Sequence, residues 1–203
     1  MVYATVRKIL IPVFRSKFDS INGIENLPEQ GPYIITSNHI DFLDGFYIAI
    51  ALDLVKNHEV YFLSKTRNYW WSQATLPINK EDKSQSIEKA IEYLKEGKII
   101  CNFIEGKRNA KKHLLEGKTG SARMALMAKV PIVPIGIIGP TEKTFIRSVT
   151  KMLTKNNQVT LNIGQPINFD KYYSQDFDKK LLNELTDQVM QSLSPLCQKT
   201  YSF

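Results

Sequence analysis

The stretch SNHIDFLDG, residues 37–45, lies between two apolar runs, YIIT at 33–36 and FYIAIAL at 46–52. This order predicts a buried strand that leads into a helix, with polar side chains at the junction. Histidine titrates near neutral pH, so His39 beside Asp44 is a candidate general base with its orienting carboxylate. On a regular helix the two would stand about 140° apart, so they can meet only if His39 precedes the helix. A helix-capping carboxylate next to an incidental histidine is the alternative.

Composition bounds the class of protein but does not choose the function. The 203 residues have the hydrophobic and charged content of one folded domain. A formal net charge of +7 favours anionic partners, such as phosphate-bearing ligands, anionic lipids or nucleic acid. Cys101 and Cys197 are too few and too isolated for a disulfide framework or a metal site. Cys101 lies in an apolar run and is predicted to be a core residue.

The N-terminal segment, residues 1–18, combines cations with apolar side chains. Its longest apolar run, residues 9–14, is far shorter than the roughly 20 residues of a spanning helix, and no cleavage site follows it. Two interpretations stay open. The segment is either a basic amphipathic anchor on a membrane surface or a helix packed on the body of the protein. Residues 19–203 are predicted to form one domain.

The rest of the chain alternates between strand and helix patterns. Apolar runs predict strands at residues 33–36, 59–64, 99–104, 130–139 and 158–164, the fourth broken by prolines. Apolar residues at helical spacing predict helices near residues 46–52, 86–96, 119–129 and 177–193. This alternation predicts a single layered α/β domain with a mostly parallel sheet flanked by helices.

Polar side chains follow three of the predicted strands. In α/β sheets, ligands bind at the carboxyl ends of the strands, so these side chains are expected to share one site. A base, an orienting carboxylate and several cations suit the activation of a hydroxyl on a substrate that also carries a phosphate. The residues are His39 and Asp44 after the first strand, Lys65 and Arg67 after the second, and Glu105 and Arg108 after the third.

Four blocks of this sequence resemble the glycerophospholipid acyltransferases. NHIDFLD at residues 38–44 resembles the family's His-x4-Asp motif, and FIEGKRN at 103–109 is similar to its Phe-Pro-Glu-Gly-Thr-Arg-Ser block. VPIVPI at 130–135 is similar to the Val-Pro-Ile-Val-Pro-Val block, and Lys65 stands where the second motif has its lysine. The blocks occur in the family's order, and the likeness extends over residues 13–167. Singly the His-x4-Asp match is weak, but the set is specific.

The resemblance implies a glycerol-3-phosphate acyltransferase-like fold and an acyltransferase domain at 19–203. The implied reaction moves a fatty acyl group from acyl-CoA or acyl-carrier protein to the hydroxyl of a lysophospholipid, foremost 1-acylglycerol-3-phosphate, giving phosphatidic acid. His39 would be the general base and Asp44 its orienting acid. The thioester is a co-substrate, and neither a cofactor nor a metal is expected. The resemblance implies that the acceptor is bound by Lys65, Glu105, Gly106 and Arg108, and that Lys65 and Arg108 bind its phosphate.

Several residues depart from the family pattern and leave the acceptor open. Asp41 adds a carboxylate inside the first motif, which either caps the helix, the favoured interpretation, or acts on the neighbouring imidazole. Ile104, Lys107 and Asn109 replace the usual Pro, Thr and Ser. Another lysophospholipid or a lipid alcohol is therefore an alternative acceptor. A lipid-binding module with little activity is the alternative from another class.

The expected partners are the thioester donor, the lysophospholipid and an anionic membrane surface. The chain carries no recognised nucleic-acid motif, so no nucleic-acid partner is expected. The apolar acyl chain of the substrate and the absence of a long apolar run together predict a peripheral protein on the cytoplasmic face of a membrane. The protein is expected to insert partly through its N-terminal segment and exposed aromatic side chains.

Overall fold

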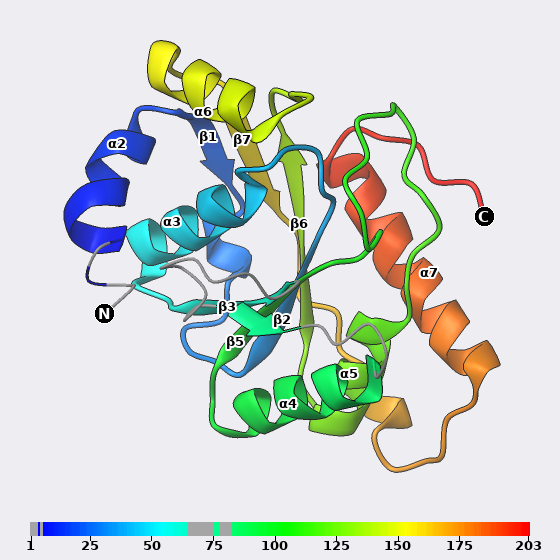
Figure 1. Ribbon diagram of the computed structural model, residues 1–203. Helices are drawn as coiled ribbons and strands as arrows, with labels where there is room; N and C mark the ends of the chain where they lie inside the picture. The colour runs from blue at the N-terminus through cyan, green and yellow to red at the C-terminus, as the bar shows by residue number, and fades with distance from the viewer. Residues whose placement is uncertain (1–3, 5, 65–74, 78–82) are drawn as a thin grey trace.

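The structure is a computed structural model that describes residue 4 and residues 6–64, 75–77 and 83–203 (Figure 1). The strands are β1 (Phe18–Asn22), β2 (Tyr33–Ser37), β3 (Val60–Ser64), β4 (Thr75–Pro77), β5 (Ile99–Phe103), β6 (Ile132–Ile138) and β7 (Val159–Ile163). The helices are η1 (Val6–Leu10), α2 (Ile11–Arg15), α3 (Asp44–Lys56), α4 (Lys83–Lys95), α5 (Gly120–Ala128), α6 (Phe145–Thr154) and α7 (Lys179–Leu196). Short 3-10 turns lie at Ile24–Asn26 and Asp170–Tyr172.

The seven strands form one sheet in the order β1-β7-β6-β2-β5-β3-β4. Every neighbouring pair is parallel except β6 and β7, so the prediction of a mostly parallel α/β sheet is confirmed. The strands β2, β3, β5 and β6 run in the same direction, and their carboxyl ends meet at one edge. Ser37, the last residue of β2, lies opposite Phe103 of β5 and Ile135 of β6. The loops that follow these strands therefore start side by side.

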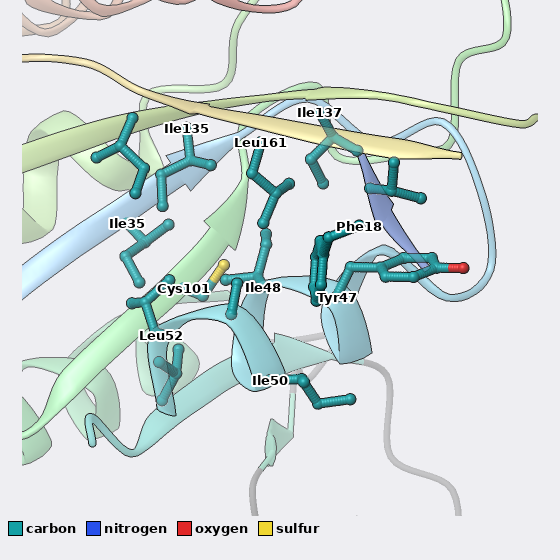
Figure 2. Close-up of a cluster of buried hydrophobic side chains, with 14 of the residues drawn as sticks. Phe18, Ile35, Tyr47, Ile48, Ile50, Leu52, Cys101, Ile135, Ile137 and Leu161 are labelled. Atoms are coloured by element: carbon teal, nitrogen blue, oxygen red, sulfur yellow. The ribbon is translucent and has the colours of Figure 1, made fainter. Parts of the chain in front are cut away.

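Helices cover both faces of the sheet and enclose two apolar cores. Successive residues of β2 divide between them: Ile35 packs with α3 residues such as Ile48, while Ile34 packs with residues of α4, α5 and α7. Figure 2 shows the first core, where Ile48 and Leu52 of α3 point at Ile35 and Cys101 of the sheet. Because α3 is buried along most of its length, its first residue, Asp44, is held firmly against the sheet edge.

Cys101 is the core residue that the sequence predicts. It is fully buried and makes no disulfide. Burial raises the pKa of its thiol well above the ordinary value, and the negative charge of Asp44 acts in the same direction. The thiol is therefore neutral and is not a nucleophile.

The N-terminal segment packs on the body of the protein through part of its surface. Phe14 is buried, and its ring lies edge-on to Tyr47 of α3 at 5.2 Å between centroids. The Arg7 guanidinium bonds Asp53 of the same helix at 2.8 Å. The packed-helix interpretation thus accounts for one side of the segment, while Ile9 projects outward. Among the described residues, no helix is long and apolar enough to cross a membrane.

Several features of the fold differ from the predictions or were missing from them, and the short strand β4 is one that the sequence did not predict. The segment before residue 33 contributes an edge strand, β1, whose alternation includes polar side chains. The helix α6, which follows β6, was missing from the predictions, although its apolar residues have helical spacing in the sequence. The prediction that prolines break β6 is wrong: the strand continues through Pro134, whose carbonyl accepts a hydrogen bond from Gly164 N at 2.9 Å. Gly164 lies just past the end of β7, so the missing N–H of the proline falls where the ladder ends.

Candidate active site

His39 and Asp44 meet as the strand–turn–helix pattern predicts. His39 lies in the turn after β2, and Asp44 is the first residue of α3. The His39 Nδ1 atom is 2.7 Å from Asp44 Oδ2. The same oxygen accepts hydrogen bonds from the backbone N–H groups of Ile40, at 2.7 Å, and Asp41, at 2.8 Å. One buried carboxylate oxygen therefore fixes both the imidazole and the backbone of the turn that carries it.

This arrangement assigns the proton of the neutral imidazole. An ionised carboxylate oxygen can only accept, so His39 Nδ1 must be the donor in its contact with Asp44. The other ring nitrogen, Nε2, then carries the lone pair. The His39 side chain is 22% exposed, while that of Asp44 is 2% exposed, so the imidazole is reachable from solvent and the carboxylate beside it is not. This is the arrangement that a general base requires.

Burial is the largest influence on the Asp44 carboxyl. It raises the pKa of Asp44 above the ordinary value, because taking the charge out of water is unfavourable. The hydrogen bond and the charge of His39, and the backbone donors of Asp41 and Ile40, lower the pKa and oppose that rise. These donors are what make a buried carboxylate tolerable at this position.

An aromatic stack fixes the plane of the imidazole. The His39 ring lies on Phe103 with 4.1 Å between centroids and 16° between planes. Phe103 in turn stacks on Phe62 of β3, at 6.4 Å and 24°. Because Phe103 ends β5 and lies opposite Ser37 in the register, the parallel sheet places this ring beside the turn after β2. Stacking and the bond to Asp44 together leave the imidazole little rotational freedom.

Glu105 is buried beneath the loop that follows β5. Its Oε2 accepts hydrogen bonds from Asn109 Nδ2 at 2.6 Å and Leu115 N at 2.9 Å. Its Oε1 is buried and has no hydrogen-bond partner among the described residues. One carboxylate thus connects Asn109 with Leu115 across the loop. The sequence did not predict this structural role of Glu105. Asn109, which replaces the usual Ser of the family block, donates one of these hydrogen bonds to Glu105.

The two loops of the site are joined directly. Asn109 N donates to His39 O at 2.6 Å, and Ile104 N donates to Ser37 O at 3.1 Å. The Arg108 guanidinium lies over the Phe42 ring at 3.4 Å, a cation–π contact between the two sequence blocks. Arg108 is exposed, so its donors remain accessible to an anion. The structure therefore brings His39, Asp44, Glu105 and Arg108 to one edge of the sheet.

Gly106 and the C-terminal segment shape the same loop. Gly106 has φ +70°, a left-handed conformation that side-chain-bearing residues rarely adopt, and its role here is conformational. Lys199 Nζ donates to Asn109 O at 2.7 Å, and Leu114 N donates to Thr200 O at 2.8 Å. These C-terminal contacts had no signal in the sequence. The predicted phosphate ligand Lys65, and Arg67 beside it, lie outside the described residues.

Asp41 turns away from the imidazole and ties the turn to α6. Its Oδ2 accepts from Ser148 Oγ and from Glu142 N, both at 2.9 Å. Its Oδ1 accepts from Leu43 N at 3.2 Å, just before the helix begins. The favoured expectation of a helix cap is thus only partly right, because most of its bonds connect the turn to a distant segment. Ser148 could not be found from the sequence, because it lies 107 positions away.

With this geometry in place, sequence comparison gives the class of protein. Residues 20–138 match the family described as Acyltransferase, which is more than half of the chain. The chain belongs to the acyltransferase family, and it is an acyltransferase.

Relatives and a solved structure agree with this membership. A Bacillus subtilis protein named 1-acyl-sn-glycerol-3-phosphate acyltransferase is 27% identical, with 86% of each chain covered. A Streptococcus pneumoniae protein of the same name is 30% identical over 73% of this chain and 57% of its own length. The crystal structure of the 1-acyl-sn-glycerophosphate acyltransferase PlsC from Thermotoga maritima has a TM-score of 0.63 and 19% identity, covering 100% of this chain and 85% of that one. The last likeness supports the fold alone.

The hydrogen bond from Ser148 Oγ to Asp41 Oδ2 joins α6 to the turn that carries His39, and it predicts a measurable effect on stability. Ser148→Ala removes one donor from a buried carboxylate, so the free energy of unfolding in urea should fall by about 1–3 kcal/mol. Ser192→Ala is the matched control, because Ser192 is half-buried and its hydroxyl makes an exposed hydrogen bond to the Gln188 carbonyl of its own helix. The control should stay within about 0.5 kcal/mol of the wild type. Equal stability of the two variants would contradict a stabilising role for the hydrogen bond between Ser148 and Asp41.

Proposed function

We propose that this acyltransferase acylates the free hydroxyl of a lysophospholipid, with 1-acylglycerol-3-phosphate as the leading acceptor and phosphatidic acid as the product. The observation that carries the proposal is the pairing of His39 Nδ1 with the buried Asp44 carboxylate, which leaves Nε2 as an accessible base. Arg108 supports the choice of a phosphate-bearing acceptor, because an exposed guanidinium at the same edge can hold two phosphate oxygens. The names of the bacterial relatives point to the same acceptor.

The proposed reaction is a direct transfer. His39 Nε2 takes the proton of the acceptor hydroxyl while that oxygen attacks the thioester carbon. A new C–O bond forms, the tetrahedral intermediate collapses, and the C–S bond breaks. The imidazolium, stabilised by Asp44, returns the proton to the departing thiolate. Atoms and charges balance without a covalent enzyme intermediate, a metal or a cofactor, and either acyl-CoA or acyl-carrier protein can supply the thioester.

The phosphate site is proposed to comprise Arg108 and Lys65, with Glu105 and Gly106 shaping it. Arg108 is positioned from two sides: the ring of Phe42 lies beneath it, and the Glu105 carboxylate holds the loop it stands on. Gly106 permits the turn that leads into this loop. Acylation of another lysophospholipid or of a lipid alcohol needs the same base and differs only at the headgroup. A lipid-binding module with little activity is the alternative that the assay below separates.

We further propose that the protein works as a peripheral protein at the cytoplasmic face of a membrane. The acceptor is a lipid, and the N-terminal segment presents Ile9 together with cations such as Lys8. Phe14 of this segment belongs to the core, so deleting the segment would test folding as much as membrane contact. Single exposed residues are the better targets.

His39→Ala tests the proposed base. We expect its kcat to fall by roughly 10²–10⁴-fold, because the acceptor hydroxyl loses its proton acceptor. The assay supplies purified protein with acyl-CoA or acyl-carrier protein and a panel of lysophospholipids and lipid alcohols. His113→Ala is the control, since His113 is an exposed histidine, and it should keep wild-type activity. Full activity of His39→Ala would exclude this mechanism, and a wild type that acylates no acceptor would favour the lipid-binding alternative.

Arg108→Lys tests the phosphate contact. An ammonium keeps the charge but loses the two-pronged geometry and the flat contact on Phe42, so the KM for 1-acylglycerol-3-phosphate should rise by about tenfold. The KM for the thioester should change much less. Lys112→Gln, an exposed cation of the same loop, should leave both constants near their wild-type values. An equal rise for both substrates in Arg108→Lys would place Arg108 elsewhere.

A further inference from the structure

The helix α6 exposes an unusual share of the apolar surface. Among the described residues, eight large apolar side chains are exposed, and three of them lie on this ten-residue helix. Phe145 is 43% exposed, Ile146 75% and Leu153 61%. Its inner side is occupied by Ser148 and Met152, which are buried. A helix that already packs on the body through one side therefore presents a second apolar side to its surroundings.

The segment that carries this apolar surface is also rich in cations. Residues 141–157 carry four of them, Lys143, Arg147, Lys151 and Lys155, against one acid, Glu142. Glu142 is paired with Lys151 at 2.9 Å, and Arg147 reaches it only at 3.8 Å. Lys143, Arg147 and Lys155 are exposed. The local excess of positive charge thus lies on α6, through Arg147 and Lys151, and just beyond its two ends, through Lys143 and Lys155.

The position of α6 connects it to the site. Figure 1 shows the helix at the outer edge of the molecule, beside β1 and β7. Phe145, its first residue, contacts Phe42 edge-on with 6.2 Å between centroids, and Phe42 supports the Arg108 guanidinium. On its inner side, Ser148 holds Asp41 in the turn that carries His39. A surface that takes up Phe145 therefore lies one aromatic ring away from the proposed phosphate ligand.

We propose that α6 is a docking helix for an anionic lipid bilayer. Exposed Ile, Leu and Phe side chains flanked by Lys and Arg are the composition of a helix that lies in the headgroup region. Apolar side chains this exposed are unfavourable in water and are stabilised by burial between acyl chains. A bilayer with anionic headgroups can pair with the cations and bury the apolar side chains at the same time. This inference goes beyond the proposed reaction and uses none of its steps.

The test measures vesicle binding. Flotation with phosphatidylcholine vesicles containing phosphatidylglycerol should show that Ile146→Ser combined with Leu153→Ser weakens partitioning roughly tenfold or more. Met127→Ser is the control, because Met127 is an exposed apolar residue of α5, and its binding should not change. Lys143→Gln combined with Arg147→Gln should weaken binding to these vesicles at least about fivefold. It should have little effect on vesicles of phosphatidylcholine alone.

Two results would overturn the proposal. The first is wild-type vesicle binding by the Ile146 and Leu153 double variant, or a loss confined to Ile9→Ser on the N-terminal segment. The second is a double variant that binds vesicles normally but loses binding to immobilised acyl-carrier protein, which would make α6 a protein-docking surface. Vesicle binding is read without acyl transfer, so failure of the proposed reaction leaves this test intact.

Discussion

The arrangement of the site depends on one buried carboxylate oxygen, Oδ2 of Asp44. It receives the imidazole N–H of His39 and two backbone N–H groups of the turn between them. Removing that oxygen would leave three donors without a partner, two of them in the buried backbone. The same contact therefore closes the turn, begins the helix and orients the imidazole. The motif spacing follows from this, because only a side chain at the first helical position can reach back to all three donors.

The sheet determines what surrounds the His39 imidazole. Because β2 and β5 are parallel and in register, the loops after them begin together, and Asn109 N can bond His39 O at 2.6 Å. The Glu105 carboxylate accepts hydrogen bonds from Asn109 and Leu115 and so fixes the loop after β5. Arg108 of this loop lies over the Phe42 ring. The carboxylate, the imidazole and the guanidinium thus occupy fixed places because the backbone that carries them is fixed.

The sequence predicts these features where the signal is local. The run around 33–52 predicts β2, α3 and the His39–Asp44 contact, because the strand–turn–helix geometry is encoded within twenty residues. The bonds of Asp41 to Ser148 and of Lys199 to Asn109 join positions about a hundred apart, and no local pattern marks such partners. The antiparallel pairing of β7 with β6 depends on the path of the chain through α6, a helix whose apolar residues have helical spacing in the sequence.

The most direct measurement is the tautomer of the His39 ring. Nitrogen-15 NMR of protein labelled at its three histidines, with His39 assigned by its absence in His39→Ala, reads the proton on each ring nitrogen at a pH where the ring is neutral. The Asp44 contact predicts a proton on Nδ1 and a free lone pair on Nε2. A neutral ring protonated on Nε2 would contradict the account, because the exposed nitrogen could not then accept the proton of an acceptor hydroxyl.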